Sequence, residues 1–269
     1  MNRIFLTSLL LISLNGNAQE LFSMTEPASN IAAKSISIRI DQSIMDELNS
    51  STINYHLIPE LSFGVSKKFM MRGSTFFSNR SKQFRNEGGS LYGKYRFLSK
   101  DALQKHFRMA VFGTLAFNNS DIHQEEINMN GHNTGFEAGI VATQLLKKMA
   151  ISSSFSFLKA VDNGNNNKFI YGTSNSQALN YSISVGKLML PKAYTDYRQT
   201  NLNLMAEILS QVNTGSGKYY VDMAAIVQFI FNSVSRFDLG YRKQLSSDQL
   251  RTAPNGFFIR LEYNFFNAF

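Results

Sequence analysis

Several residue types are missing from this chain of 269 residues, and each absence narrows what the protein can be. Cysteine is absent, which excludes disulfide bonds, thiolate metal sites, a cysteine nucleophile and the cysteine-linked lipid of anchored exported proteins. Tryptophan is absent too, and the 4 prolines are too few to break many strands. Charged residues reach only 17%. The fold must therefore be held by hydrogen bonds and packing.

The signatures of several enzyme classes are also missing. The sequence holds no Gly-x-Ser-x-Gly elbow, phosphate-binding loop, zinc-hydrolase motif or dinucleotide fingerprint. Outer-membrane lipases place a serine and a histidine on the lipid face of a barrel. Ser153 is the only serine worth testing for such a role, because no histidine lies on that face within a predicted strand. We expect no enzymatic activity and no cofactor.

Basic residues outnumber acidic ones, 27 to 19, which gives a net charge of +8 and an isoelectric point near 9.6. They are scattered along the chain and form no run of the kind that binds nucleic acid. We therefore expect outer-membrane lipid and lipopolysaccharide as partners, and no nucleic acid.

Residues 1–18 are typical of a cleaved signal peptide. Arg3 supplies the positive start, residues 4–14 form the apolar stretch, and Gly16 and Ala18 are the small residues before the cleavage point. A membrane-spanning helix is the alternative, but about eleven apolar residues are fewer than the roughly 20 that cross a bilayer core. We expect export from the cytoplasm.

Apolar and polar residues alternate along much of the remaining chain, as in a strand with two different faces. The last segment shows this most clearly, because the odd positions from Phe257 to Phe265 are apolar or aromatic, whereas Arg260, Glu262 and Asn264 are polar. In a barrel wall the apolar face touches lipid and the polar face encloses a lumen. An aromatic content of 13% suits both strands and membrane interfaces.

The alternation predicts about twelve strands, with ends uncertain by two to four residues. Tight connections follow the second, sixth and tenth strands, and long polar ones follow the third, fifth and seventh. Short periplasmic turns with long outer loops are typical of bacterial outer-membrane barrels. The predicted strands span residues 35–46, 53–65, 69–77, 88–98, 107–118, 134–146, 149–159, 177–189, 200–212, 218–231, 235–245 and 256–268.

The predicted fold is therefore all-β, a transmembrane antiparallel up-and-down β-barrel over residues 35–269. A periplasmic N-terminal segment over residues 19–34 precedes it, and the predicted location is the outer membrane of a Gram-negative bacterium. A soluble β-sandwich also alternates, but its polar face would meet water with few charges. Two predicted periplasmic turns, residues 99–106 and 191–199, are longer than the barrel pattern prefers.

The polar faces of the predicted strands carry charges of both signs in nearly equal number. Such residues select permeants by charge in a water-filled lumen, whereas in a narrow lumen they pair and close it. The pattern favours a passive channel for small polar or amphipathic solutes. The alternative is a closed structural, ligand-binding or adhesion-binding barrel with a salt-bridged lumen and no conductance. The predicted lumen-lining residues are Arg39, Asp41, Glu60, Arg72, Lys94, Arg96, Arg108, Glu137, Glu207, Asp222, Arg236, Asp238, Arg242, Arg260 and Glu262.

The long polar connection over residues 119–133 holds the one weak candidate for a metal site, His123, Glu125 and His132. Imidazole and carboxylate groups can hold a divalent metal ion. Their spacing is irregular, so a solvated extracellular loop without metal is the favoured interpretation.

The closing residues 258–269 resemble the C-terminal signal by which the barrel-assembly machinery recognises outer-membrane barrels. That signal requires a terminal aromatic residue and alternating apolar positions, and Asn267 departs from the alternation. The resemblance implies that the assembly machinery is a partner. The matching positions are Leu261, Tyr263, Phe265 and Phe269.

Two further motifs, YHLIPE at residues 55–60 and SFGV at residues 62–65, resemble a group of Bacteroidota outer-membrane barrels described as transporters. The chain is similar, more distantly, to the outer-membrane family of the phenol-degradation meta-pathway. The resemblance covers most of the chain after the signal peptide. It implies a transporter-like barrel and does not define the small solute.

Overall fold

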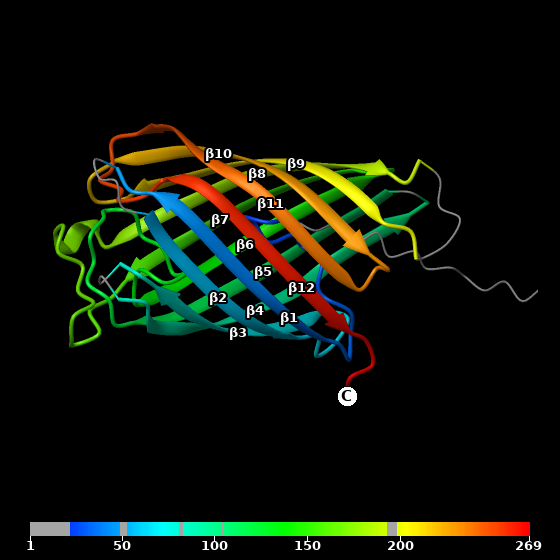
Figure 1. Cartoon of the computed structure of the whole chain (residues 1–269), viewed down its shortest axis with the longest axis horizontal. Coiled ribbons are helices and arrows are strands. Elements are labelled where there is room, and N and C mark those ends of the chain that lie inside the picture. Colours follow the sequence, from blue (N-terminus) through cyan, green and yellow to red (C-terminus); the bar gives the residue numbers. More distant parts are fainter. Residues whose placement is uncertain (1–21, 49–52, 81–82, 104, 193–197) are drawn as a thin grey trace, which may run out of the picture.

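Twelve antiparallel strands form a single closed barrel (Figure 1). Each strand is hydrogen-bonded to its neighbours in the sequence, and β1 closes the sheet against β12. The computed structural model describes residues 22–48, 53–80, 83–103, 105–192 and 198–269. The predicted all-β barrel of twelve strands is confirmed, and the β-sandwich is wrong. The strands are β1 (Ile36–Asp46), β2 (Ile53–Phe63), β3 (Phe69–Ser78), β4 (Arg85–Ala102), β5 (Lys105–Asn118), β6 (Gly135–Leu146), β7 (Met149–Ala160), β8 (Gln177–Leu190), β9 (Asn201–Asn213), β10 (Tyr219–Phe231), β11 (Ser235–Ser247) and β12 (Asn255–Phe265).

The outside of the barrel is apolar all the way round. Large apolar side chains are exposed on each of the twelve strands, as Ile38 of β1, Leu115 of β5 and Leu261 of β12 illustrate. A closed barrel has no unpaired sheet edge, so its backbone groups are satisfied even in hydrocarbon. An apolar exterior of this kind suits lipid and would be costly in water. Among the described residues, no helix is long and apolar enough to cross a membrane.

Opposite charges face each other across the strands near the closing seam. Arg39 of β1 stands opposite Glu60 of β2 and Glu262 of β12, and Asp41 stands opposite Arg260. Directly opposed residues of antiparallel strands lie close enough to interact. Because of this register, charged residues at alternate positions of neighbouring strands form ion pairs inside the barrel.

The β4–β5 connection and the end of β12 differ from the sequence prediction. β4 and β5 continue their pairing as far as Ala102 and Lys105, so the connection expected over residues 99–106 is a tight turn. β12 ends at Phe265, because Asn267 has a φ of 52° and turns the backbone out of the extended conformation. Phe269 therefore lies beyond the strand, although its side chain is exposed.

The N-terminal segment, defined here as residues 22–35, runs inside the barrel, as the dark blue chain in Figure 1 shows. The sequence assigned most of it to the periplasm. The segment then leaves the lumen next to β2, where the backbone N–H of Lys34 donates to the carbonyl of Gly64 at 2.7 Å. A Cβ on Gly64 would stand 1.9 Å from the carbonyl oxygen of Ala32, so this close approach requires glycine. The predicted signal peptide, residues 1–18, lies outside the described residues.

The inward loop, defined as residues 119–134, folds back into the outer end of the barrel. Ile122, Ile127 and Met129 are buried in a small apolar core with Leu158 of β7 and Phe169. The expectation of a solvated loop is wrong for these side chains, because they pack against apolar partners that are distant in the sequence. The loop narrows the lumen from the end of the barrel that carries the long loops.

Candidate functional site in the lumen

Fourteen of the fifteen predicted lumen-lining residues contact other groups in the barrel interior. Arg96 is the exception, since it lies at the rim beside the tight turn after β2 and donates to the carbonyl of Lys67 at 2.6 Å. The prediction missed the partners that come from irregular segments. These are Glu26 of the N-terminal segment, Glu126 of the inward loop, and Arg80 and Arg251 of the loops after β3 and β11.

Glu207 of β9 anchors the tip of the N-terminal segment. Its carboxylate accepts hydrogen bonds from the backbone N–H groups of Ser23 at 2.9 Å, Met24 at 3.0 Å and Thr25 at 2.9 Å. The hydroxyl of Ser23 donates to Asp238 at 2.5 Å. A fully buried carboxylate is stable only when its charge is met by donors of this kind. Glu207 therefore binds the segment as if it were a ligand.

The inner cluster consists of Glu26, Arg39, Glu60, Arg72 and Lys94, and it holds the middle of the same segment. Glu26 pairs with Arg72, with Arg39 at 3.4 Å and with Lys94 at 3.6 Å. The ammonium group of Lys94 also donates to the carbonyls of residues 27 and 29 at 2.8 and 2.7 Å. Beside this cluster only about 40 Å³ of cavity remains, room for a few water molecules. The N-terminal segment thus fills the half of the lumen farther from the long loops.

The outer cluster consists of Glu126, Asp222, Arg242 and Arg251. Asp222 accepts from Arg251 at 2.7 and 2.8 Å and pairs with Arg242 at 2.5 Å, while Glu126 accepts from Arg251 at 2.7 Å. Arg251 also lies over the ring of Tyr220, 3.9 Å from its centroid. Burial alone would raise the pKa of the Glu126 carboxyl, but Arg251 and Arg242 hold it below its usual range. This network fastens the inward loop to β10 and β11.

His132 of the inward loop lies stacked on His56 of β2, with ring centroids 5.2 Å apart. Its Nδ1 is 2.6 Å from the guanidinium of Arg80, which also pairs with Glu87 at 2.6 Å. Burial lowers the pKa of His132 well below its usual value, and the charge of Arg80 lowers it further. His132 is therefore neutral and accepts a hydrogen bond from Arg80.

The three weak metal candidates do not come together. His123 is exposed, Glu125 pairs with Lys218 at 2.6 Å, and His132 faces Arg80. Within the described ranges, no group of three or more histidine, aspartate or glutamate side chains could hold a metal ion. Glu125 and His132 are therefore engaged by basic side chains, and His123 is exposed, so the three residues do not form a metal site.

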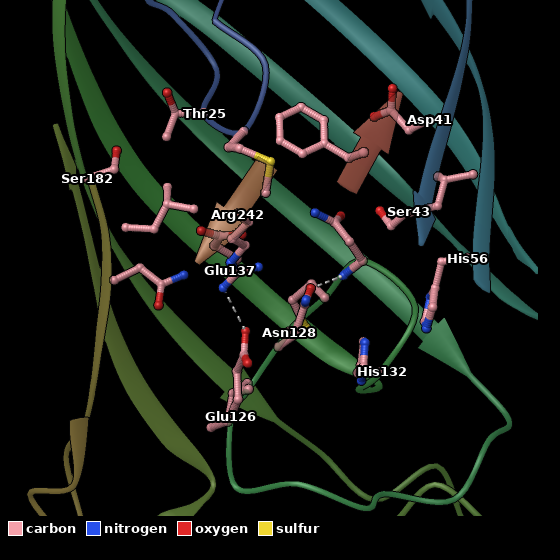
Figure 2. A pocket seen from close by; sticks show the side chains of 18 of the residues that line it. Thr25, Asp41, Ser43, His56, Glu126, Asn128, His132, Glu137, Ser182 and Arg242 are labelled. Atoms are coloured by element: carbon pink, nitrogen blue, oxygen red, sulfur yellow. Dashed lines mark hydrogen bonds and ion pairs between the residues drawn. The ribbon is translucent and has the colours of Figure 1, made fainter. Parts of the chain in front are cut away.

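A cavity of about 340 Å³ lies between the N-terminal segment and the inward loop (Figure 2). Figure 2 shows Thr25 on one side of this space, Glu126, Asn128 and His132 on the other, and Ser182 on the surrounding wall. A volume of this size is at the lower end of the range for small-molecule sites. It can hold a compact solute rather than a large one.

The wall of the lumen is not uniform. The inward side chains of β10, β11, β12 and β1 to β4 form a charged wall that contains both clusters. β7 and β8 instead present a hydroxyl wall, which carries no inward charge. Its members are Ser152, Ser154, Ser156, Asn180, Ser182 and Ser184.

Acids outnumber bases among the described residues that face the lumen between its two rims. All the bases have an acidic partner within ion-pair distance. Glu207 is satisfied by the N-terminal segment, so Glu137 is left as the carboxylate without a charged partner. Arg108, which donates to Ser29 of the N-terminal segment, pairs with Asp101 at 3.4 Å. The bases are Arg39, Arg72, Arg80, Lys94, Arg108, Arg236, Arg242, Arg251 and Arg260, and the acids are Glu26, Asp41, Glu60, Glu87, Glu126, Glu137, Glu207, Asp222, Asp238 and Glu262.

No family model and no curated protein matches the chain. Among solved structures, the barrel is similar to an outer membrane channel from Pseudomonas putida F1, with a TM-score of 0.56 and 12% identity over 91% of this chain and 99% of that one. It is also similar to the NanC porin, with a TM-score of 0.51 and 10% identity over 85% and 98% of the two chains. The chain therefore has the fold of outer-membrane β-barrel channels.

Proposed function

We propose that this protein is a passive channel of the bacterial outer membrane for small polar or amphipathic solutes. The observation that carries the proposal is the cavity of about 340 Å³ inside the lumen. The N-terminal segment and the inward loop bound this cavity, and both are held by side-chain contacts rather than by hydrogen bonds of the sheet. The apolar exterior and the channel fold support the membrane location.

The route for a solute runs along the hydroxyl wall. The charged wall is neutralised by its own ion pairs, whereas the hydroxyls of β7 and β8 offer weak, exchangeable hydrogen bonds. Conduction requires binding that is favourable enough to enter and weak enough to leave. Passage to the periplasm requires the N-terminal segment to move, because it fills that half of the lumen.

A closed barrel without conductance is the second candidate, and a specific observation favours it. The N-terminal segment is held by Glu207 and by the inner cluster, and the space left beside it is about 40 Å³. If those contacts never open, the lumen is a salt-bridged interior and the loops outside carry the function.

Planar bilayer recording of the purified protein distinguishes the two. We expect conductance steps from the wild type and larger or longer openings from Glu207→Gln, because the substitution removes the charge that holds Ser23, Met24 and Thr25. Absence of steps from both proteins at every voltage would favour the closed barrel.

The partners and the assembly route belong to the same proposal. Leu261, Tyr263, Phe265 and Phe269 are all exposed on the outside of the chain's last segment, where the assembly machinery and then lipid can contact them. Outer-membrane lipid and lipopolysaccharide are the proposed surroundings of the apolar wall. The resemblance to Bacteroidota transporters and to the phenol-degradation family stays a prediction.

A further inference from the structure

Glu137 of β6 is the charged side chain of the cavity that the rest of the protein does not neutralise. It lines the cavity, and its Oε1 accepts a hydrogen bond from Ser156 at 2.5 Å. Among the described residues it forms no ion pair. A carboxylate removed from bulk water is costly unless a cation or several donors meet it. A cation in the cavity would give Glu137 the charged partner that the described residues do not supply.

A second unsatisfied polar group lies in the same row of the wall. Tyr92 of β4, Thr114 of β5 and Glu137 stand opposite one another across three neighbouring strands. Tyr92 is only 6% exposed, it lines the cavity, and its hydroxyl has no hydrogen-bond partner among the described residues. Buried polar groups in native proteins are nearly always partnered by protein, water or a ligand, so the Tyr92 hydroxyl can take a partner from the cavity that it lines.

The surroundings of Glu137 define what else the ligand must carry. The cavity is lined there by the hydroxyls of Thr114, Ser154, Ser156 and Ser182, which donate to and accept from hydroxyl groups equally well. Phe112, next to Tyr92 with ring centroids 6.0 Å apart, adds an apolar surface. This combination fits a compact solute with several hydroxyls and one positive charge.

We propose that the cavity binds a hydroxylated organic cation of the amino-sugar or amino-alcohol class, with its ammonium group on Glu137. The hydroxyl wall receives the hydroxyls of the solute, and the hydroxyl of Tyr92 receives one further polar atom. The excess of acids over bases in the lumen also favours a cation, through the electrostatic potential at longer range. This inference rests on the proposed channel function, since it names the solute class for that cavity.

Three probes of similar size and different charge test the proposal: glucosamine, glucose and glucuronate. Calorimetric titration of the full-length protein in detergent measures binding whether or not the barrel conducts. We expect glucosamine to bind at least about tenfold more tightly than glucose, and glucuronate not to bind, because a charge-assisted hydrogen bond contributes about a factor of ten or more.

Matched variants assign the effect to the site. Glu137→Gln keeps the shape and removes the charge, and we expect it to bind glucosamine about tenfold more weakly, no better than glucose. Glu137→Asp keeps the charge and should keep the preference. Asp162→Asn makes the same charge change in an exposed loop and should bind like the wild type. The heat-dependent shift of the folded barrel on a detergent gel confirms that each variant folds.

Equal affinities for glucosamine and glucose in the wild type, or an unchanged preference in Glu137→Gln, would overturn the inference. The channel proposal is judged separately, by bilayer conductance in the absence of the probes. Preferential glucosamine binding by a protein that never conducts would support the cation site and reject the channel.

Discussion

The charged wall and the hydroxyl wall enclose the same lumen and differ in the partners of their polar side chains. Side chains of the charged wall find their partners within the protein, partly across neighbouring strands and partly in the N-terminal segment and the inward loop. On the hydroxyl wall, Ser154 and Ser182 line the cavity and bond to each other at 2.6 Å, whereas Ser156 donates to Glu137 and Ser184 donates to Glu207. The first wall therefore organises the structure, while the second stays available to a solute.

The largest expected effect comes from breaking the outer cluster. Asp222→Ala leaves Glu126 as the acid that must serve both Arg242 and Arg251. Removing one partner of a buried ion pair costs about 3–5 kcal/mol, so we expect a clear drop in the urea midpoint of the folded barrel on a detergent gel. Asp162→Asn is the control. An unchanged midpoint would mean that the charged wall does not hold the structure.

A smaller effect is expected where the N-terminal segment meets Glu207. The chain has no cysteine, so Ser29→Cys introduces a unique reporter at a buried position of this segment. We expect Glu207→Gln to accelerate labelling of that cysteine by a maleimide about tenfold or more, because hydrogen bonds to a charged group contribute about 1.5–3 kcal/mol. Ser182→Ala, on the hydroxyl wall, should leave the rate unchanged. Equal rates in all three backgrounds would argue that Glu207 does not anchor the segment.

The inward loop should respond to acid through His132. Its pKa is lowered in the folded loop, so the loop's stability is full above the unfolded value near 6.5 and declines as the pH falls below it. At pH 5 the loss is at most about 2 kcal/mol, the limit for an imidazole that stays neutral in the folded loop. Arg80 and His56 contact it, and the charges of Arg242 and Arg251 also lower its pKa. Hydrogen exchange of residues 119–134 should be faster at pH 5 than at pH 7.5, after correction for intrinsic rates, and His132→Asn should weaken this difference.

The smallest effect is expected on the hydroxyl wall itself. Ser182→Ala removes a neutral hydrogen bond to Ser154, and we expect the urea midpoint to change by the equivalent of less than about 1 kcal/mol. A loss as large as that of Asp222→Ala would remove the distinction between the two walls.

The fold could be predicted from the sequence because lipid and lumen impose a period of two on every strand. The alternation from Phe257 to Phe265 fixes both the strand and its outward face, and the same rule placed Arg39, Asp41 and Arg260 on the inward face. In these segments the local alternation is sufficient to predict both the strand and the direction of its side chains.

The contents of the lumen could not be predicted in this way. Glu126 and Arg251 are separated by 125 positions, and both lie in irregular segments that show no periodicity. The N-terminal segment likewise gives no sign in its sequence that Glu26 and the backbone of Ser23 bind inside the barrel. Such contacts form only when the barrel closes and brings distant segments together. The only sign of them in the sequence is the set of charged lumen residues that need partners.

The most direct test of the account is the reactivity of single cysteines on the two walls. Ser154→Cys lies on the large cavity, whereas Ser62→Cys lies on the charged wall beside the N-terminal segment. During bilayer recording we expect a small, positively charged thiol reagent to block Ser154→Cys faster than Ser62→Cys, because the N-terminal segment covers Ser62 until it moves. Block of Ser62→Cys with no effect on Ser154→Cys would contradict a solute route along the hydroxyl wall.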